Sequence, residues 1–144
     1  MKQVVTIIVF LLLFFNSNGQ MTPNDYVETF FKDFITNSDK AIDDIYKTNP
    51  YTAEMGDAVN NMKEVAANYP NSLGKYYGYE FLTQEKATNN FLLFSYFVRF
   101  DRQPMKFTFI FYKANDKWAL YSLNFSANID EELEQAAKDL QSKN

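Results

Sequence analysis

Side chains that could perform catalysis are scarce in this sequence. The chain of 144 residues contains no histidine and no cysteine. It therefore has no Ser-His-Asp or Cys-His nucleophile system, and it carries no zinc signature, phosphate-binding loop or dinucleotide fingerprint. Carboxylates such as Glu28, Asp33 and Glu64 could act as general bases, but they lie off the apolar stripes, which predicts solvent-exposed side chains. We expect no metal, no cofactor and no catalytic residue.

Arg99 and Lys106 form the sharpest local charge signal. If Arg102 and Gln103 are a two-residue hairpin loop, Arg99 lies directly opposite Lys106 on the neighbouring strand. Like charges that face each other are unfavourable unless something neutralises them. The pair predicts contact with an anionic ligand or with a carboxylate of a partner subunit. The alternatives are that both side chains extend to water or that Asp101 neutralises one of them.

Aromatic residues make up 18% of the chain and gather mostly in its second half. In the same register Tyr96 opposes Phe109, and a short loop at residues 86–89 places Tyr77 and Tyr79 on the same apolar face. Tyr76 falls on the opposite, mixed face. A packed core is the default fate of such a face, and a cavity that holds a ligand is the functional alternative. Tyr77, Tyr79, Tyr96 and Phe109 are therefore the candidate ligand-binding residues.

Two hydrophobic periods position these side chains. Period 3.6 predicts three helices before residue 70, the first beginning with Thr22 as N-cap and Pro23 at the first helical position. Period two predicts four strands at residues 75–85, 91–100, 105–114 and 118–126, and a last amphipathic helix follows from residue 128. A three-residue loop before Trp118 places Tyr121, Leu123 and Phe125 on the apolar face. The order predicts an α+β domain in which N-terminal helices pack on a curved four-stranded antiparallel sheet.

The N-terminal segment has the features of a secretory signal peptide. Lys2 precedes an apolar run at residues 4–15, which is shorter than the ~20 residues that a spanning helix needs. Ser17 and Gly19 provide small residues for cleavage before Gln20. We expect residues 1–19 to be the signal peptide, residues 20–144 to form one domain, and the protein to be exported, either periplasmic or secreted.

The charge balance excludes two classes of partner. The chain has 18 acidic against 14 basic residues, a net charge of −4, and no basic run. Nucleic acid and anionic membrane both require clustered cations, so we expect neither as a partner.

The order of elements, which closes on a Trp-x-Leu strand at Trp118-Ala119-Leu120, resembles the nuclear transport factor two-like superfamily of cone-shaped α+β domains. A cystatin-like domain is the second fold candidate. The resemblance implies a pocket between helices and sheet and frequent homodimerisation through the outer sheet face. It does not select a function.

Three functions are therefore open. The leading one is an exported, non-enzymatic domain that holds a small apolar or amphipathic ligand. The second is an interaction or dimerisation module using the outer sheet face, with Phe97, Ile110 and Tyr112 around Arg99 and Lys106. The third is a cofactor-free isomerase or lyase.

Overall fold

The computed structural model describes residues 20–141, and the predicted signal peptide at residues 1–19 lies outside them. The fold is α+β, as the sequence predicts. Its elements, in order, are α1 (Pro23–Phe34), α2 (Ser38–Tyr46), the 3-10 helix η1 (Thr52–Met55), α3 (Gly56–Ala67), α4 (Tyr69–Ser72), β1 (Tyr76–Thr88), β2 (Phe91–Phe100), β3 (Met105–Lys113), β4 (Trp118–Ser126) and α5 (Asp130–Gln141). Among residues 20–141 no helix is both long and apolar enough to cross a bilayer.

The first helix begins where its capping residues predict. Thr22 is the N-cap, its hydroxyl accepts the backbone N–H of Asp25, and the Asp25 carboxylate accepts the backbone N–H of Thr22 at 2.7 Å. Pro23 occupies the first turn, where no intrahelical N–H is needed. Val27, Phe30, Phe31 and Phe34 form the buried stripe that faces the sheet.

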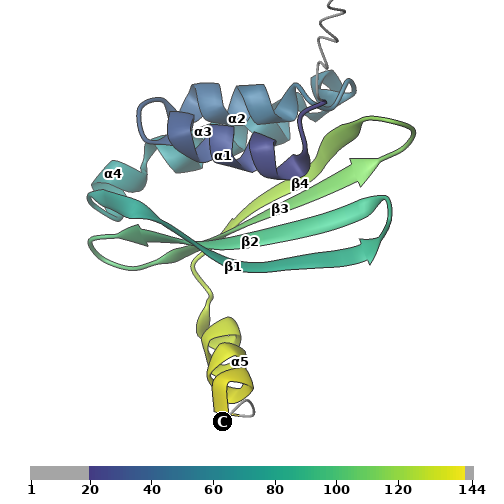
Figure 1. Ribbon diagram of the computed structural model, residues 1–144. Coiled ribbons are helices and arrows are strands. Elements are labelled where there is room, and N and C mark those ends of the chain that lie inside the picture. Colours follow the sequence, from purple (N-terminus) through teal and green to yellow (C-terminus); the bar gives the residue numbers. More distant parts are fainter. Residues whose placement is uncertain (1–19, 142–144) are drawn as a thin grey trace, which may run out of the picture.

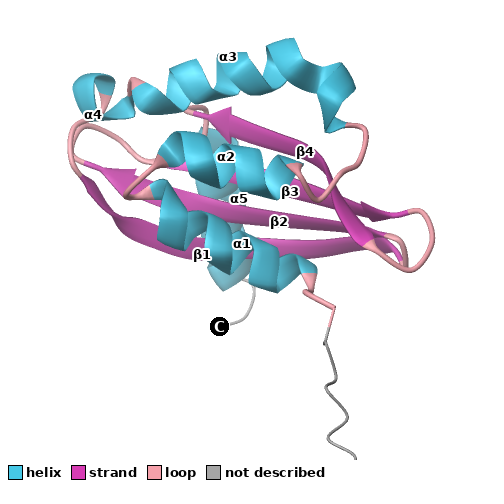
Figure 2. Ribbon diagram, turned by 90° about the horizontal axis from the view of Figure 1, so that it is seen from above, coloured by secondary structure: helices cyan, strands magenta, loops and turns pink. Residues whose placement is uncertain are grey.

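Among residues 20–141, a helical layer covers one face of the sheet and a single helix lies on the other side. The four strands follow chain order and pair antiparallel. Figure 1 shows α1, α2 and α3 above this curved sheet and α5 projecting away below it. Seen from above, α1 lies toward the β1 side and α3 toward the β4 side (Figure 2). The two faces of the sheet therefore meet different surroundings.

The loop between β2 and β3 is longer than predicted. Strand β2 ends at Phe100 and β3 begins at Met105, as predicted, but the last pair between them is Val98 with Met105, so the register differs from the prediction by two residues. Because the shift is even, every side chain of β2 and β3 keeps its predicted face. The predicted opposition of Arg99 and Lys106 is wrong, since Lys106 pairs with Phe97.

A bulge in β1 changes which tyrosine meets the helices. The register slips between Tyr76 and Gly78, so Tyr76 shares the helix-facing side with Phe100 and packs against the core. Tyr77 is turned to the outer face instead. The sequence analysis placed Tyr77 on the helix-facing side and Tyr76 on the outer side. This assignment is wrong, because the extra residue in the bulge reverses the alternation of side chains.

A second bulge lies in β4. Leu123 pairs with Phe109 and Phe125 with Phe107, as the three-residue loop predicts. The register then slips by one, so Leu120 takes the buried place predicted for Tyr121. Tyr121 is 59% exposed, which corrects the prediction for that residue.

Candidate functional site

The predicted ligand-binding aromatic residues meet a helix side chain. The ring of Phe31 stacks on Tyr79 with centroids 3.9 Å apart, and its edge contacts Tyr96 at 5.1 Å and Phe109 at 5.7 Å. Phe31 and Phe109 are fully buried, and Tyr96 is nearly so. The structure thus brings three of the four predicted residues together, and the space between them holds a phenylalanine ring.

The two predicted cations have partners within the chain. The Arg99 guanidinium lies 3.2 Å from the Glu80 carboxylate and donates a 3.0 Å hydrogen bond to the Tyr77 carbonyl. Lys106 forms an ion pair with Glu132 of α5. Each cation is therefore neutralised locally by a carboxylate of a neighbouring element.

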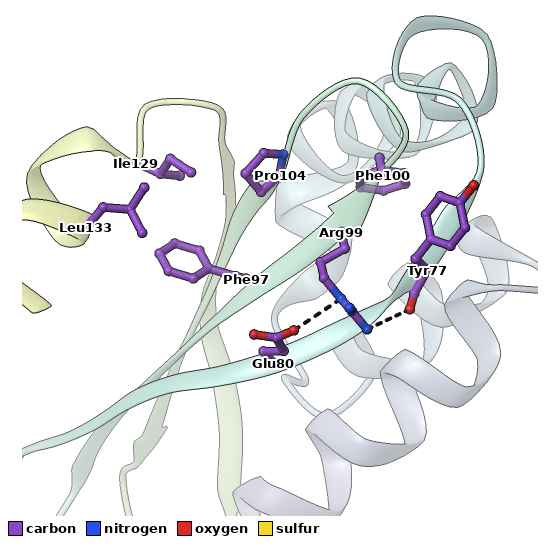
Figure 3. A pocket seen from close by; sticks show the side chains of 8 residues that line it. All are labelled: Tyr77, Glu80, Phe97, Arg99, Phe100, Pro104, Ile129 and Leu133. Carbon is purple, nitrogen blue, oxygen red and sulfur yellow. Dashed lines mark hydrogen bonds and ion pairs between the residues drawn. The ribbon is translucent and has the colours of Figure 1, made fainter. Parts of the chain in front are cut away.

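A hollow of about 490 Å³, the outer-face pocket, lies between α5 and the sheet. Phe97, Ile129 and Leu133 form its apolar side, and Arg99 with Glu80 forms its polar side (Figure 3). The Arg99 guanidinium forms an ion pair with Glu80 and donates a hydrogen bond to the Tyr77 carbonyl, as the dashed lines in Figure 3 show.

A larger hollow of about 650 Å³, the helix–sheet pocket, lies where the helical layer meets the ends of β1 and β2. This volume is within the range of small-molecule sites. It is lined by Phe34, Ile35, Thr36, Asn37, Ser38, Asp39, Ala66, Ala67, Tyr69, Pro70, Gly74, Lys75, Tyr76 and Phe100. Ile35 ends the apolar stripe of α1 yet is 58% exposed, so the pocket presents an apolar side chain to solvent.

Tyr69 and Tyr76, which both line this pocket, carry hydroxyls that are buried in the protein. Tyr69 is only 6% exposed, and neither its hydroxyl nor that of Tyr76 has a hydrogen-bond partner among the described residues. Both rings pack edge-on against Phe100, with centroids 5.6 and 5.9 Å away. Burial raises the pKa of Tyr69 to about 12 and is also the main cause that raises the pKa of Tyr76 to about 12. Both phenols are therefore neutral hydrogen-bond donors at ordinary pH.

The rim between the two pockets is held by Asp101. Its carboxylate accepts the Lys75 backbone N–H at 2.6 Å and the Tyr77 hydroxyl at 2.7 Å. Gly74 sits at φ +84°, and a Cβ there would lie 2.6 Å from an Asp101 oxygen. This close approach needs glycine, because a side chain would be both strained and in steric conflict. Asp101 therefore clamps the β2–β3 loop onto the segment that enters β1.

The clamp predicts a pH-dependent stability. The Tyr77 and Lys75 hydrogen bonds hold the pKa of Asp101 below its usual 3.8. A depressed folded pKa contributes stability above the unfolded value, and that stability is lost as pH falls through the folded pKa. We expect Asp101→Asn to lower Tm at pH 7, and the difference from the unaltered protein to shrink below about pH 4. Thermal melts of both proteins between pH 7 and pH 2.5 measure this Tm difference. An equal Tm difference at pH 7 and at pH 2.5 would show that the Asp101 carboxylate does not stabilise the fold through these hydrogen bonds.

The carboxylates considered as general bases lie on the polar side of the helices. Glu28 accepts a 2.6 Å hydrogen bond from the Asn24 amide, and Asp33 pairs with Lys40 at 2.5 Å. Glu64 is exposed on α3. None of the three lines the helix–sheet pocket. Within residues 20–141 no group of three or more His, Cys, Asp or Glu side chains is arranged to hold a metal ion.

Sequence reasoning did not select Tyr69, Tyr76, Phe100 and Ile35 as site residues. Tyr69 directly precedes Pro70, and Ile35 stands at the end of an apolar stripe, which are weak signals of helix ends rather than of a site. The pocket forms where the ends of several helices meet the ends of two strands. This arrangement depends on three-dimensional packing, which the sequence pattern does not contain.

Comparison with known proteins found no matching family model, no matching curated protein and no matching solved structure. The resemblance to the nuclear transport factor two-like superfamily stays a prediction.

Proposed function

We propose that the chain is an exported, non-enzymatic domain that binds a small apolar or amphipathic ligand in the helix–sheet pocket. The single observation that carries the proposal is a hollow of about 650 Å³ where the helical layer meets the sheet, lined by the aromatic residues Phe34, Tyr69, Tyr76 and Phe100. The exposed Ile35 adds apolar surface. Burial of an apolar ligand surface against these side chains is favourable.

The site differs in position from the face that the sequence favours. The Tyr79, Tyr96 and Phe109 cluster surrounds Phe31, whereas the helix–sheet pocket lies at the end of the sheet. The proposal keeps the ligand class and the location between helices and sheet, and it assigns contact to Tyr69, Tyr76 and Phe100.

A second candidate is a homodimer or protein complex formed through the outer sheet face. The observation in its favour is a group of exposed aromatic rings, Phe91, Tyr112 and Tyr121, on three neighbouring strands. Phe91 stacks on Tyr112 with centroids 4.7 Å apart. Apolar patches of this kind are common at protein interfaces.

Native mass spectrometry of the purified chain distinguishes the two candidates. We expect a monomer that carries an additional mass of a few hundred daltons, which is released when the protein is denatured, because a pocket of this size buries a small molecule. A bare dimer would favour the outer-face candidate. A bare monomer would contradict retention of a ligand.

A further inference from the structure

We infer that the outer-face pocket is a second binding site, which takes an α-amino acid with an apolar side chain in its zwitterionic form. The helix–sheet pocket plays no part in this inference. Three features of the outer-face pocket support it: the fixed position of Arg99, the carboxylate of Glu80 beside it, and an apolar wall to which α5 contributes.

The bulge in β1 holds Arg99 in place. Arg99 pairs with Gly78, and the next outward-facing pair joins Glu80 to Phe97. Gly78 sits at φ +112°, which glycine tolerates, and a Cβ there would lie 3.4 Å from an Arg99 nitrogen. Tyr77 is the extra residue of the bulge, and its carbonyl accepts a 3.0 Å hydrogen bond from the guanidinium. Bulges are common beside functional sites, where they redirect individual groups.

The Arg99 guanidinium keeps donors that its own chain does not use. Arginine has five N–H groups. Nε lies 3.2 Å from a Glu80 oxygen and Nη2 donates to the Tyr77 carbonyl, whereas Nη1 makes no hydrogen bond or ion pair within residues 20–141. The Arg99 side chain is 54% exposed and lines the pocket (Figure 3). A carboxylate in the pocket can therefore accept charge-assisted hydrogen bonds from Nη1.

Glu80 determines which kind of ion fits. Its carboxylate is 62% exposed, and Glu80 and Arg99 are the two charged residues that line the pocket. The ammonium and the carboxylate of an α-amino acid are attached to one carbon, so each can face its opposite in the protein and the four charges alternate around a square. Arg99 and Glu80 then stay together. A ligand with only one of these charges gains one partner but also meets a like charge.

The apolar wall suits the side chain of the amino acid. Phe97 belongs to β2 and Pro104 to the loop that follows it, while Ile129 and Leu133 lie at the start of α5. Ile129 and Leu133 are four residues apart and therefore lie on one side of the helix. Leu133 is 48% exposed, so a ligand can bury apolar surface against it, which is favourable.

Three matched probes test the inference: L-phenylalanine, 3-phenylpropanoate, which lacks the ammonium group, and 2-phenylethylammonium, which lacks the carboxylate. Backbone amide NMR titrations at neutral pH give their affinities, and we expect L-phenylalanine to bind most tightly. We expect Arg99→Gln to weaken L-phenylalanine and 3-phenylpropanoate about fivefold but not 2-phenylethylammonium. We expect Glu80→Gln to weaken L-phenylalanine about threefold, while 3-phenylpropanoate binds at least as tightly as before.

Glu85→Gln is the matched control. Glu85 is an exposed glutamate of the same strand and lies outside the pocket, so we expect this substitution to leave all three affinities unchanged. Arg99 and Glu80 are each more than half exposed, so we expect all three variants to fold like the unaltered protein.

The Ala67→Trp variant separates this site from the helix–sheet pocket, because Ala67 lines that pocket and not the outer-face pocket. Unchanged affinities in this variant support the outer-face site. Loss of binding would assign the probes to the helix–sheet pocket and contradict the inference. The inference is also wrong if L-phenylalanine shifts no amide of the outer-face pocket, if 3-phenylpropanoate binds as tightly as L-phenylalanine, or if Glu80→Gln has no larger effect than Glu85→Gln.

Discussion

Replacing Phe31 with alanine should lower the free energy of unfolding by about 3–5 kcal/mol and Tm by about 10–20 °C. Phe31 is fully buried, and its ring contacts Tyr79, Tyr96 and Phe109 at once. Removing the ring deletes these contacts and leaves a cavity that close-packed neighbours fill only in part. Chemical and thermal denaturation measure the loss.

Phe81→Ala is the matched control, because it deletes the same atoms from a position on the edge strand β1 that is 59% exposed. The Phe81 ring meets the Tyr96 ring edge-on, with centroids 5.6 Å apart. We expect it to change Tm by less than about 3 °C. The Phe31→Ala cavity should also bind benzene, as engineered apolar cavities do. Equal losses from the two substitutions would mean that Phe31 does not fill the concave face and that the hollow predicted from sequence is real.

Much of the fold could be predicted because it depends on local chemistry. Thr22 and Pro23 specify the start of α1, and the change of hydrophobic period specifies the passage from helices to strands. The faces of β2 and β3 were predictable even though the loop length was not, since a shift of two residues preserves side-chain alternation. This holds even though β2 is apolar at most positions on both of its faces.

The errors in face assignment arise at bulges. One extra residue near Tyr77 and another near Tyr121 reverse the alternation over part of each strand. Single residues of these types do not mark a bulge, because bulges respond to sheet curvature and to the loops that flank them. Gly78, at φ +112°, is the one local feature beside the first bulge that hints at it.

The pocket depends on packing that a one-dimensional pattern does not contain. Its wall comes from the ends of α1 and α3, the start of α2, the short α4 and the ends of two strands. Asp101 fixes the rim through contacts with residues far away in sequence, Lys75 and Tyr77. Charge pairing also depends on three-dimensional packing, because Lys106 and Glu132 pair only when α5 lies under the sheet.

Ala67→Trp should abolish binding at the helix–sheet pocket while leaving the fold intact. Ala67 is the last residue of α3, is exposed, and lines the pocket. An indole at this position occupies space that a ligand needs. We expect saturable binding of Nile red, an uncharged dye that becomes fluorescent in apolar sites, to be lost, since the cost of displacing the indole subtracts directly from the binding free energy.

Ala58→Trp provides the control, because Ala58 is exposed on the same helix about 13 Å along its axis and lies outside the pocket. The most direct measurement is therefore a Nile red titration of three proteins: the unaltered chain, Ala58→Trp and Ala67→Trp. A pocket-based binding domain predicts saturable fluorescence with the first two and none with the third. Equal binding by all three, or binding lost in Ala58→Trp and kept in Ala67→Trp, would show that the helix–sheet pocket is not where this protein holds its ligand.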